Sequence, residues 1–185
     1  MVEVVKINPD KVKARMADAG VSIEALAPAV ARPGLSADAA ARALSNWIAG
    51  RNHPRAGVQD VRAIAEALSC RPADIARFES QARFVRSSAR KARLMADLIR
   101  GRRVDDAVTL LEFNHRRAAS MVVKALKSAI ADAEQSEADV ARLFVAESRV
   151  DGGPIIKRFQ PKDRGRAHPI RKRTSHIVVG VEEAA

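Results

Sequence analysis

Basic side chains are concentrated in one short segment of the chain, which runs from Lys157 to Arg173. Its seventeen positions hold eight Lys or Arg residues and a single acid, Asp163. Lysine and arginine bind phosphate, and so many like charges repel one another unless a polyanion neutralises them. The segment therefore predicts a nucleic-acid contact. The eight basic residues are Lys157, Arg158, Lys162, Arg164, Arg166, Arg171, Lys172 and Arg173.

Side chains that could perform catalysis or bind a metal are dispersed. Cys70 is the only cysteine, and no metal-ligand spacing, Gly-rich phosphate loop or nucleophile motif occurs. The adjacent Asp105 and Asp106 fall in the first turn of an expected helix, where the helix dipole explains them. We predict no catalytic residue, no metal site and no cofactor. The four histidines are scattered, at His53, His115, His168 and His176.

The overall charge also favours a polyanion as partner. The 185 residues include 33 Lys and Arg against 22 Asp and Glu, a formal net charge of +11. One Trp, five Phe and no Tyr are too few for base stacking to be the main mode of binding. No apolar stretch reaches the ~20 residues of a membrane helix. The single cysteine is consistent with a reducing, cytoplasmic location.

Charge and pattern divide the chain near residue 80. Residues 1–78 carry a formal charge of +3 and residues 79–185 a formal charge of +8. The change falls at the short polar stretch Glu79-Ser80-Gln81, with no long flexible linker beside it. We expect two small domains joined closely, residues 1–79 and residues 80–185.

The first half has the apolar spacing of short helices separated by turn residues. The first expected helix lies between Pro9 and Gly20, and the second ends at Arg32-Pro33-Gly34. Ser22 and Ser36 are placed to cap the second and third helices. The remaining expected helices cover residues 23–31, 37–49, 58–68 and 72–78.

This half resembles the lambda-repressor/Cro-like helix-turn-helix family. The match lies in VSIEALA, in LSNWIAGRNHP and in VRAIAEALSCRPADI, whereas AVARPGLSADAA is longer than the family's tight turn. Base readout favours Arg, Lys, Asn or Gln near the start of the recognition helix. Here that position holds Asp38 and alanines. The polar candidates on the helix are Asp38, Arg42, Ser45 and Asn46.

The second half combines helices with strands. The pattern predicts a long hairpin over about 155–175, with its tip near Arg164-Gly165-Arg166 and Gly165 at positive φ. Arms of about ten residues would reach roughly 30 Å. Such a two-stranded ribbon is marginally stable alone, so we expect it to be ordered in an anionic environment. The other expected elements are strands at 83–86, 140–150 and 174–181 and helices at 89–100, 104–113 and from an Asn114 cap to about 133.

Residues 83–182 are similar to the large-subunit ribosomal protein L-twenty-two family. The markers are RSSARKARLMADLIRGRRVDDAVTLL, LKSAIADAEQ and VDGGPIIKRFQPKDRGRAHPIRKRTSHIVV. The resemblance implies an α+β fold in which three helices pack on a small antiparallel sheet with a long, extended basic β-hairpin. An all-α, helix-turn-helix-like bundle would precede it.

The same resemblance implies a function. It implies a cytoplasmic ribosomal protein that binds large-subunit rRNA, supports subunit assembly and lines the polypeptide exit tunnel with its hairpin. The implied partners are that rRNA, neighbouring ribosomal proteins and the nascent polypeptide. Asp163 and Pro169 depart from the residues usual in the family. The implied tip residues are Lys162, Asp163, Arg164, Gly165, Arg166, Ala167 and His168. The implied rRNA contacts are Arg83, Arg86, Ser88, Lys91, Arg93, Lys157, Arg158, Lys162, Arg164, Arg166, Arg171, Lys172, Arg173, Ser175 and His176.

Competing interpretations stay open at this stage. Ser88 could serve only as an N-cap, and His176 could form a hydrogen bond within the fold. The chain as a whole could be a DNA-binding helix-turn-helix regulator whose basic half adds affinity for RNA or DNA. A basic membrane-surface protein would instead need an amphipathic helix with bulky apolar residues. The densest charge here lies in a hairpin interrupted by Pro and Gly, so we predict no membrane partner.

Overall fold

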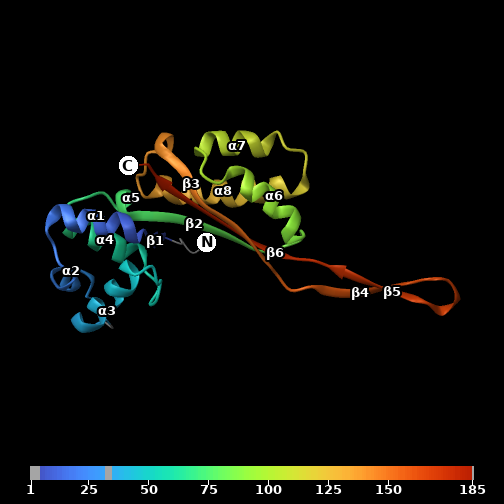
Figure 1. Ribbon diagram of the computed structural model, residues 1–185, viewed down its shortest axis with the longest axis horizontal. Coiled ribbons are helices and arrows are strands. Elements are labelled where there is room, and N and C mark those ends of the chain that lie inside the picture. The colour runs from blue at the N-terminus through green and yellow to red at the C-terminus, as the bar shows by residue number, and fades with distance from the viewer. Residues whose placement is uncertain (1–4, 32–34, 185) are drawn as a thin grey trace. The chain divides into compact units, whose positions relative to one another are not determined.

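A computed structural model describes residues 5–31 and 35–184 (Figure 1). The chain divides into two compact units, which are considered separately below. Unit 1 comprises residues 1–79, 131–140 and 182–185, and unit 2 comprises residues 80–130 and 141–181. The predicted helix break at Arg32-Pro33-Gly34 lies outside the described residues.

Unit 1 is built mainly from short, well-capped helices. Asn8 Oδ1 accepts hydrogen bonds from the backbone N–H groups of Asp10 and Lys11, and Gly20 ends the first helix at φ 63°. The hydroxyls of Ser22 and Ser36 accept from the third residue beyond each, as their types predicted. The helices are α1 (Pro9–Ala19), α2 (Ile23–Val30), α3 (Ala37–Ile48), α4 (Val58–Ala67) and α5 (Pro72–Ile75).

A strand replaces the end of the last predicted helix in this unit. The helix expected over 72–78 stops at Ile75, and β2 (Ala76–Val85) begins at once. The reason is non-local, because β1 (Val5–Ile7) pairs antiparallel with the first residues of β2, Val5 opposite Phe78. Unit 1 is therefore not purely helical. The stretch 79–81, expected to be a polar bridge between domains, lies within β2. Strand β2 also begins seven residues before the strand predicted at 83–86.

The core of unit 1 is formed by apolar side chains of its helices and of β2. Helix α3 buries Ala40, Ala43, Leu44 and Trp47. The indole Nε1 of Trp47 donates to Pro54 O, so its one polar atom is satisfied. The largest fully buried side chains of the unit are Phe78, Leu26, Leu44, Ile64, Ile75, Val12 and Val61.

Unit 2 packs helices on a sheet, which confirms the α+β class. Its strands follow the order β2-β6-β3, and α6 contacts both β3 and α7. The apolar residues Ile99, Leu111, Leu126, Leu143 and Ile177 are fully buried between these layers. The helices are α6 (Ala89–Ile99), α7 (Val104–Glu112) and α8 (Arg117–Gln135), and the strands include β3 (Leu143–Gly152) and β6 (Ser175–Glu183).

Two element boundaries in the second half differ from the sequence pattern. Helix α8 begins at Arg117, and Asn114 Oδ1 caps the preceding turn by accepting from Arg116 N. The strand expected from residue 140 begins at Leu143, because Val140–Arg142 forms a short 3-10 turn, η1. Each shift is a local turn that the apolar periodicity does not record.

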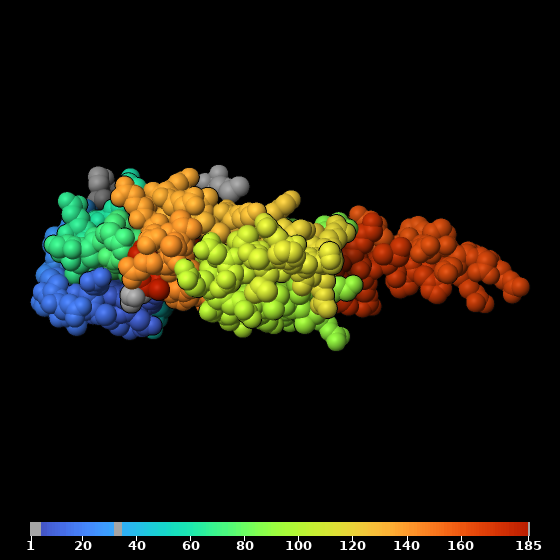
Figure 2. Space-filling model, turned by 90° about the horizontal axis from the view of Figure 1, so that it is seen from above, coloured from blue at the N-terminus to red at the C-terminus, as the bar shows by residue number. Residues whose placement is uncertain are grey.

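A two-stranded ribbon leaves the sheet of unit 2, as predicted. Strand β4 (Ile156–Pro161) pairs antiparallel with β5 (Ala167–Lys172) around the turn η2 (Asp163–Gly165). Gly165 has φ 70°, as expected for the tip, and Arg164 also has positive φ, 54°. The paired arms hold six residues each, so the paired length is about 20 Å. Figure 2 shows residues 156–172 projecting beyond the helices of their unit.

Two hydrogen bonds join the two strands at the base of this ribbon. Gly153 N donates to Thr174 O over 3.0 Å, and Thr174 Oγ1 donates to Pro154 O over 2.6 Å. A side chain at residue 153 would not fit, because its Cβ would lie 2.5 Å from Thr174 Oγ1. The glycine therefore allows the two strands to approach closely where the ribbon leaves the sheet.

Candidate nucleic-acid interface

A strongly basic pocket lies in unit 2, where the base of the ribbon meets two helices. Its volume is about 990 Å³. Among the described residues no acidic side chain lines it, whereas seven Lys or Arg residues do. Such a concentration of one charge sign attracts an anion. The lining residues are Arg86, Ser87, Ser88, Lys91, Leu94, Arg116, Arg117, Ala118, Arg171, Lys172 and Arg173.

Two helix N-termini face this pocket and add to its positive potential. Helix α6 begins after Ser88 and helix α8 begins at Arg117, and both of these residues line the pocket. The first N–H groups of a helix are unpaired and carry partial positive charge, so they bind phosphate readily. Ser88 occupies the N-cap position, but its side chain makes no capping hydrogen bond. Its hydroxyl is therefore available to a ligand.

Arg116 and Arg117 belong to this pocket, although sequence reasoning did not select them. They lie 25 residues or more after Lys91 and more than fifty before Arg171, and only the tertiary fold brings the three segments together. The available signal was the pair of arginines at the start of a long helix.

The basic surface continues along α8 beyond this pocket. A second, shallower hollow of about 590 Å³ is lined by His115, Arg116, Arg117 and Lys124 among others. At its far side Lys127 Nζ lies 2.7 Å from Glu112 Oε1, so the charge of that lysine is offset. The cationic character therefore decreases with distance from the first pocket.

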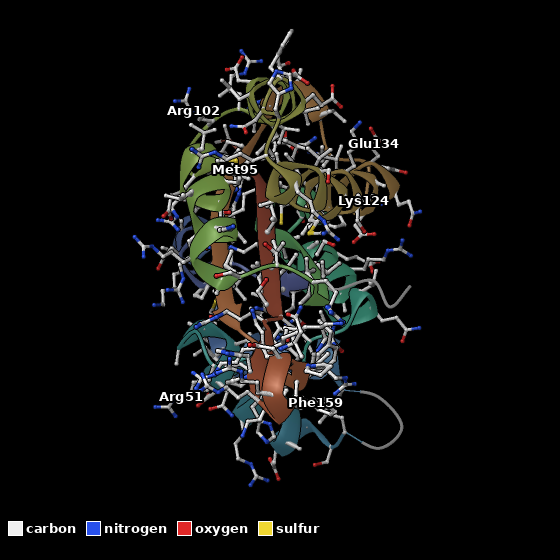
Figure 3. All side chains as sticks on the ribbon, turned by 90° about the vertical axis from the view of Figure 1, so that its right-hand side faces the viewer. Arg51, Met95, Arg102, Lys124, Glu134 and Phe159 are labelled. Carbon is white, nitrogen blue, oxygen red and sulfur yellow. The ribbon has the colours of Figure 1, made fainter. Side chains whose placement is uncertain are left out.

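The ribbon carries cations on both faces near its base. Lys157 lies opposite Arg171, and Ile156 lies opposite Lys172, so basic side chains stand on either side of the strand pair. Further out, Phe159 lies opposite Pro169, and its side chain is 74% exposed. Figure 3 looks along the ribbon toward its base, with Phe159 labelled. The ribbon thus presents a basic stem and a less charged outer part.

Comparison with known proteins identifies the region that carries these features. The sequence profile of the family described as ribosomal protein L22p/L17e matches residues 80–182. The chain belongs to this family. That L22p/L17e region contains both basic hollows and the whole ribbon.

Individual relatives match over the same part of the chain. The large ribosomal subunit protein uL22 of Syntrophotalea carbinolica is 48% identical over 106 residues, which are 57% of this chain and 96% of the relative. That of Geobacter sulfurreducens is 53% identical over 97 residues, 52% of this chain and 87% of the relative. That of Lactobacillus helveticus is 50% identical over 106 residues, 57% of this chain and 91% of the relative.

Some predicted contact residues of the L22p/L17e region are occupied by interactions within the fold. Arg93 lies outside the pocket, and its Nε donates to Val150 O over 3.0 Å. The guanidinium of Arg83 lies 5.4 Å from the centroid of the Phe84 ring, a cation–π contact on an exposed surface. Each retains further N–H donors, so each still offers hydrogen bonds to a partner.

Ser175 and His176 lie within the fold. Ser175 is fully buried, and its Oγ makes no hydrogen bond within residues 5–31 and 35–184. His176 Nδ1 accepts a hydrogen bond from Phe84 N over 3.1 Å, and the two rings meet edge to face at 4.8 Å. These contacts match the competing interpretation of His176 and place both side chains away from the basic pocket.

The tip is closed by backbone hydrogen bonds. Lys162 N donates to Arg166 O, and Arg166 N donates to Asp163 O. Every side chain from Lys162 to Pro169 is exposed. The tip residues therefore contribute little to the fold of unit 2 and are free to contact a partner.

Metal-binding clusters and membrane-spanning helices are absent from residues 5–31 and 35–184. No cluster of three or more His, Cys, Asp or Glu side chains there could hold a metal ion. The helices in these ranges are too short or too polar to cross a membrane.

Proposed function

We propose that this chain is a structural constituent of the large ribosomal subunit that binds large-subunit rRNA. The observation that carries the proposal is the basic pocket, seven cations without an acid among the described residues, inside the region that belongs to the L22p/L17e family. The relatives of that region are named large ribosomal subunit proteins. The DNA-binding alternative has no comparable support, because the family match begins at residue 80.

The geometry supports different roles for the basic pocket with the ribbon base and for the ribbon tip. The pocket and the ribbon base supply phosphate contacts, which set position and orientation without reading sequence. The finer proposal is that the ribbon enters folded rRNA and its tip, residues 162–168, borders the polypeptide exit tunnel. Neighbouring ribosomal proteins and the nascent polypeptide would then be further partners. The long exposed ribbon and the family resemblance support this placement.

Salt dependence of rRNA binding tests the proposed function. If the pocket and ribbon stem make about six to eight phosphate contacts, log K falls with log[salt] at a slope of roughly −4 to −7. Replacing Lys157, Arg158, Arg171 and Lys172 by Gln should flatten that slope. Filter binding to in vitro transcribed large-subunit rRNA over a salt series measures it. An unchanged slope would mean that the RNA contact lies elsewhere.

Incorporation in cells provides a second readout. The tagged chain should co-sediment with large subunits in sucrose gradients, and the variant with those four substitutions should remain largely in the free fraction. The matched control removes four charges that are not in the pocket or the ribbon. Arg100 and Arg149 are suitable because acids already offset them, and Arg102 and Arg103 each donate to a backbone carbonyl within the unit.

A further inference from the structure

An exposed basic segment lies in unit 1, outside the region that the family explains. It joins α3 to α4 and reads Arg51-Asn52-His53-Pro54-Arg55, and all five residues are exposed. Between Asp38 and Asp60 the chain holds three arginines, Arg42, Arg51 and Arg55, and no acid. The segment is therefore a local concentration of uncompensated positive charge.

Side chains of α3 hold this segment in one conformation. Asn46 Nδ2 donates to His53 O over 3.0 Å, and Trp47 Nε1 donates to Pro54 O. Within the segment, Asn52 Oδ1 accepts from Ala56 N over 3.1 Å. The arginines therefore extend from a fixed backbone, which lowers the entropy lost when they bind.

Arg42 extends the basic surface onto the helix itself. Residues four apart on a helix lie on the same face, about 6 Å apart, so Arg42 neighbours Asn46. Because Asn46 is bonded to the backbone at His53, the segment 51–55 runs beside this face of α3. Arg42, Arg51 and Arg55 thus belong to one surface, called here the α3–α4 basic surface.

Five other basic residues of unit 1 pair with acids of the same unit. Lys6 pairs with Glu79, Lys11 and Arg77 pair with Glu182, and Arg15 pairs with Asp74. Arg71 pairs with both Asp74 and Glu183, and these two carboxylates raise the pKa of its guanidinium. Neither Arg51 nor Arg55 has an acidic partner among the described residues. The charge of the α3–α4 basic surface is therefore available to a partner outside the chain.

We propose that the α3–α4 basic surface is a second RNA-binding site, which contacts the phosphate backbone of RNA in the large subunit. The choice of RNA rests on the proposed function, since the L22p/L17e region of the same chain would hold unit 1 beside rRNA. Tethering raises the effective concentration of RNA phosphate to the millimolar range, so two or three contacts suffice. Contacts to phosphate do not read the base sequence, so we expect this surface to bind RNA by shape and charge, without sequence preference.

The test compares full-length chains that differ only in this surface. The variant Arg51→Gln/Arg55→Gln removes two charges from it. The control Lys13→Gln/Arg62→Gln removes two charges from exposed positions of the same unit. Arg62 lines a different hollow of unit 1, with Val5, Val61 and Phe78, and none of residues 51–55 lines that hollow. Binding to large-subunit rRNA and hydroxyl-radical footprints on that RNA are measured over a salt series.

The two variants should give different results. We expect Arg51→Gln/Arg55→Gln to reduce the salt slope by about 1.4 to 1.8, the value for two lost phosphate contacts. It should also lose one protected stretch of the footprint and keep the rest. The control should resemble the unchanged chain, and Arg51→Lys/Arg55→Lys should keep most of the slope, which excludes a general loss of folding.

Three results would overturn the proposal. One is an unchanged slope and footprint for Arg51→Gln/Arg55→Gln. The second is an equal loss in the control, which would point to net charge alone. The third is weaker binding to duplex DNA with no change on rRNA, which would assign the surface to DNA. Failure of the proposed function is recognised separately. In that case the four substitutions at Lys157, Arg158, Arg171 and Lys172 would leave the salt slope of rRNA binding unchanged.

Discussion

Removing the two arginines that only the tertiary fold places in the pocket should weaken rRNA binding by a calculable amount. In Arg116→Gln/Arg117→Gln, two of the seven cations lining the 990 Å³ pocket are lost. Each phosphate contact contributes about 0.7 to 0.9 to the slope of log K against log[salt]. Two contacts therefore change the slope by about 1.6, which corresponds to about 40-fold weaker binding at 0.1 M salt and about 10-fold at 0.25 M.

If phosphate contacts are lost, the affinities of the variant and the unchanged chain approach each other as salt rises. Damage to the fold would instead weaken binding at every salt concentration. A filter-binding series from 0.05 to about 0.5 M salt with large-subunit rRNA measures it. The control Arg100→Gln/Arg149→Gln removes the same charge from unit 2. Those two arginines already pair with Asp97 and with Glu147 and Asp151. Parallel lines for the variant and the unchanged chain would refute the assignment of Arg116 and Arg117, as would an equal loss in the control.

Three further predictions concern the ribbon tip, its base and the single cysteine. Replacing residues 162–168 by a two-residue turn should leave subunit yield intact but change macrolide sensitivity, if the stem holds the ribbon and the tip borders the tunnel as proposed. Lost yield with unchanged sensitivity would reverse these roles. Gly153→Ala should lower the free energy of unfolding by about 1 to 3 kcal/mol in urea titrations, because its Cβ would lie 2.5 Å from Thr174 Oγ1. Gly152→Ala meets nothing within 4 Å and should be nearly neutral. Burial, and next the charge of Asp74, raise the pKa of the Cys70 thiol. Less of it is thiolate at pH 8 than in the unfolded chain, so iodoacetamide should alkylate the folded chain more slowly, and equal rates would refute this.

Local chemistry in the sequence was sufficient to predict the ribbon. Gly165 was assigned to the tip because a tight turn needs positive φ, and it has φ 70°. The dense cations indicated that the ribbon would not pack into a core, and every side chain of β4 after Ile156 is exposed. The helix starts at Ser22 and Ser36 were equally local, since one hydroxyl caps one turn.

Features that depend on distant partners were beyond the sequence pattern. Residues 76–78 read as a continuing helix, yet they pair with β1 from the other end of the unit. Pairing with a neighbouring strand outweighs the local helical preference of these residues. The basic pocket failed to be predicted in full for the same reason. The family resemblance implied Arg86, Lys91 and the cations near Arg171, whereas Arg116 and Arg117 enter the pocket only when α8 is placed.

The residue types alone also could not separate contact residues from supporting ones. The family resemblance implied RNA contacts for Ser175 and His176, and a hydrogen bond within the fold was the alternative for His176. The structure buries Ser175 and uses the ring of His176 to bind Phe84 N. The position of the strand explains the change, because at Thr174 the chain leaves the exposed ribbon and enters the central strand β6, whose residues are nearly all buried.

The ribbon has properties that would be faults in a protein that acted alone. Lys157 stands opposite Arg171, and like charges directly opposite each other destabilise a strand pair. A ribbon of two strands buries too little to be stable without support, and Phe159 exposes most of its ring. Under the proposed function, rRNA phosphates would neutralise the opposed cations of the stem. Departures from the usual rules of stability gather where a protein meets its partner. The sequence of the ribbon is therefore that of a chain whose final stability is reached in the complex with RNA.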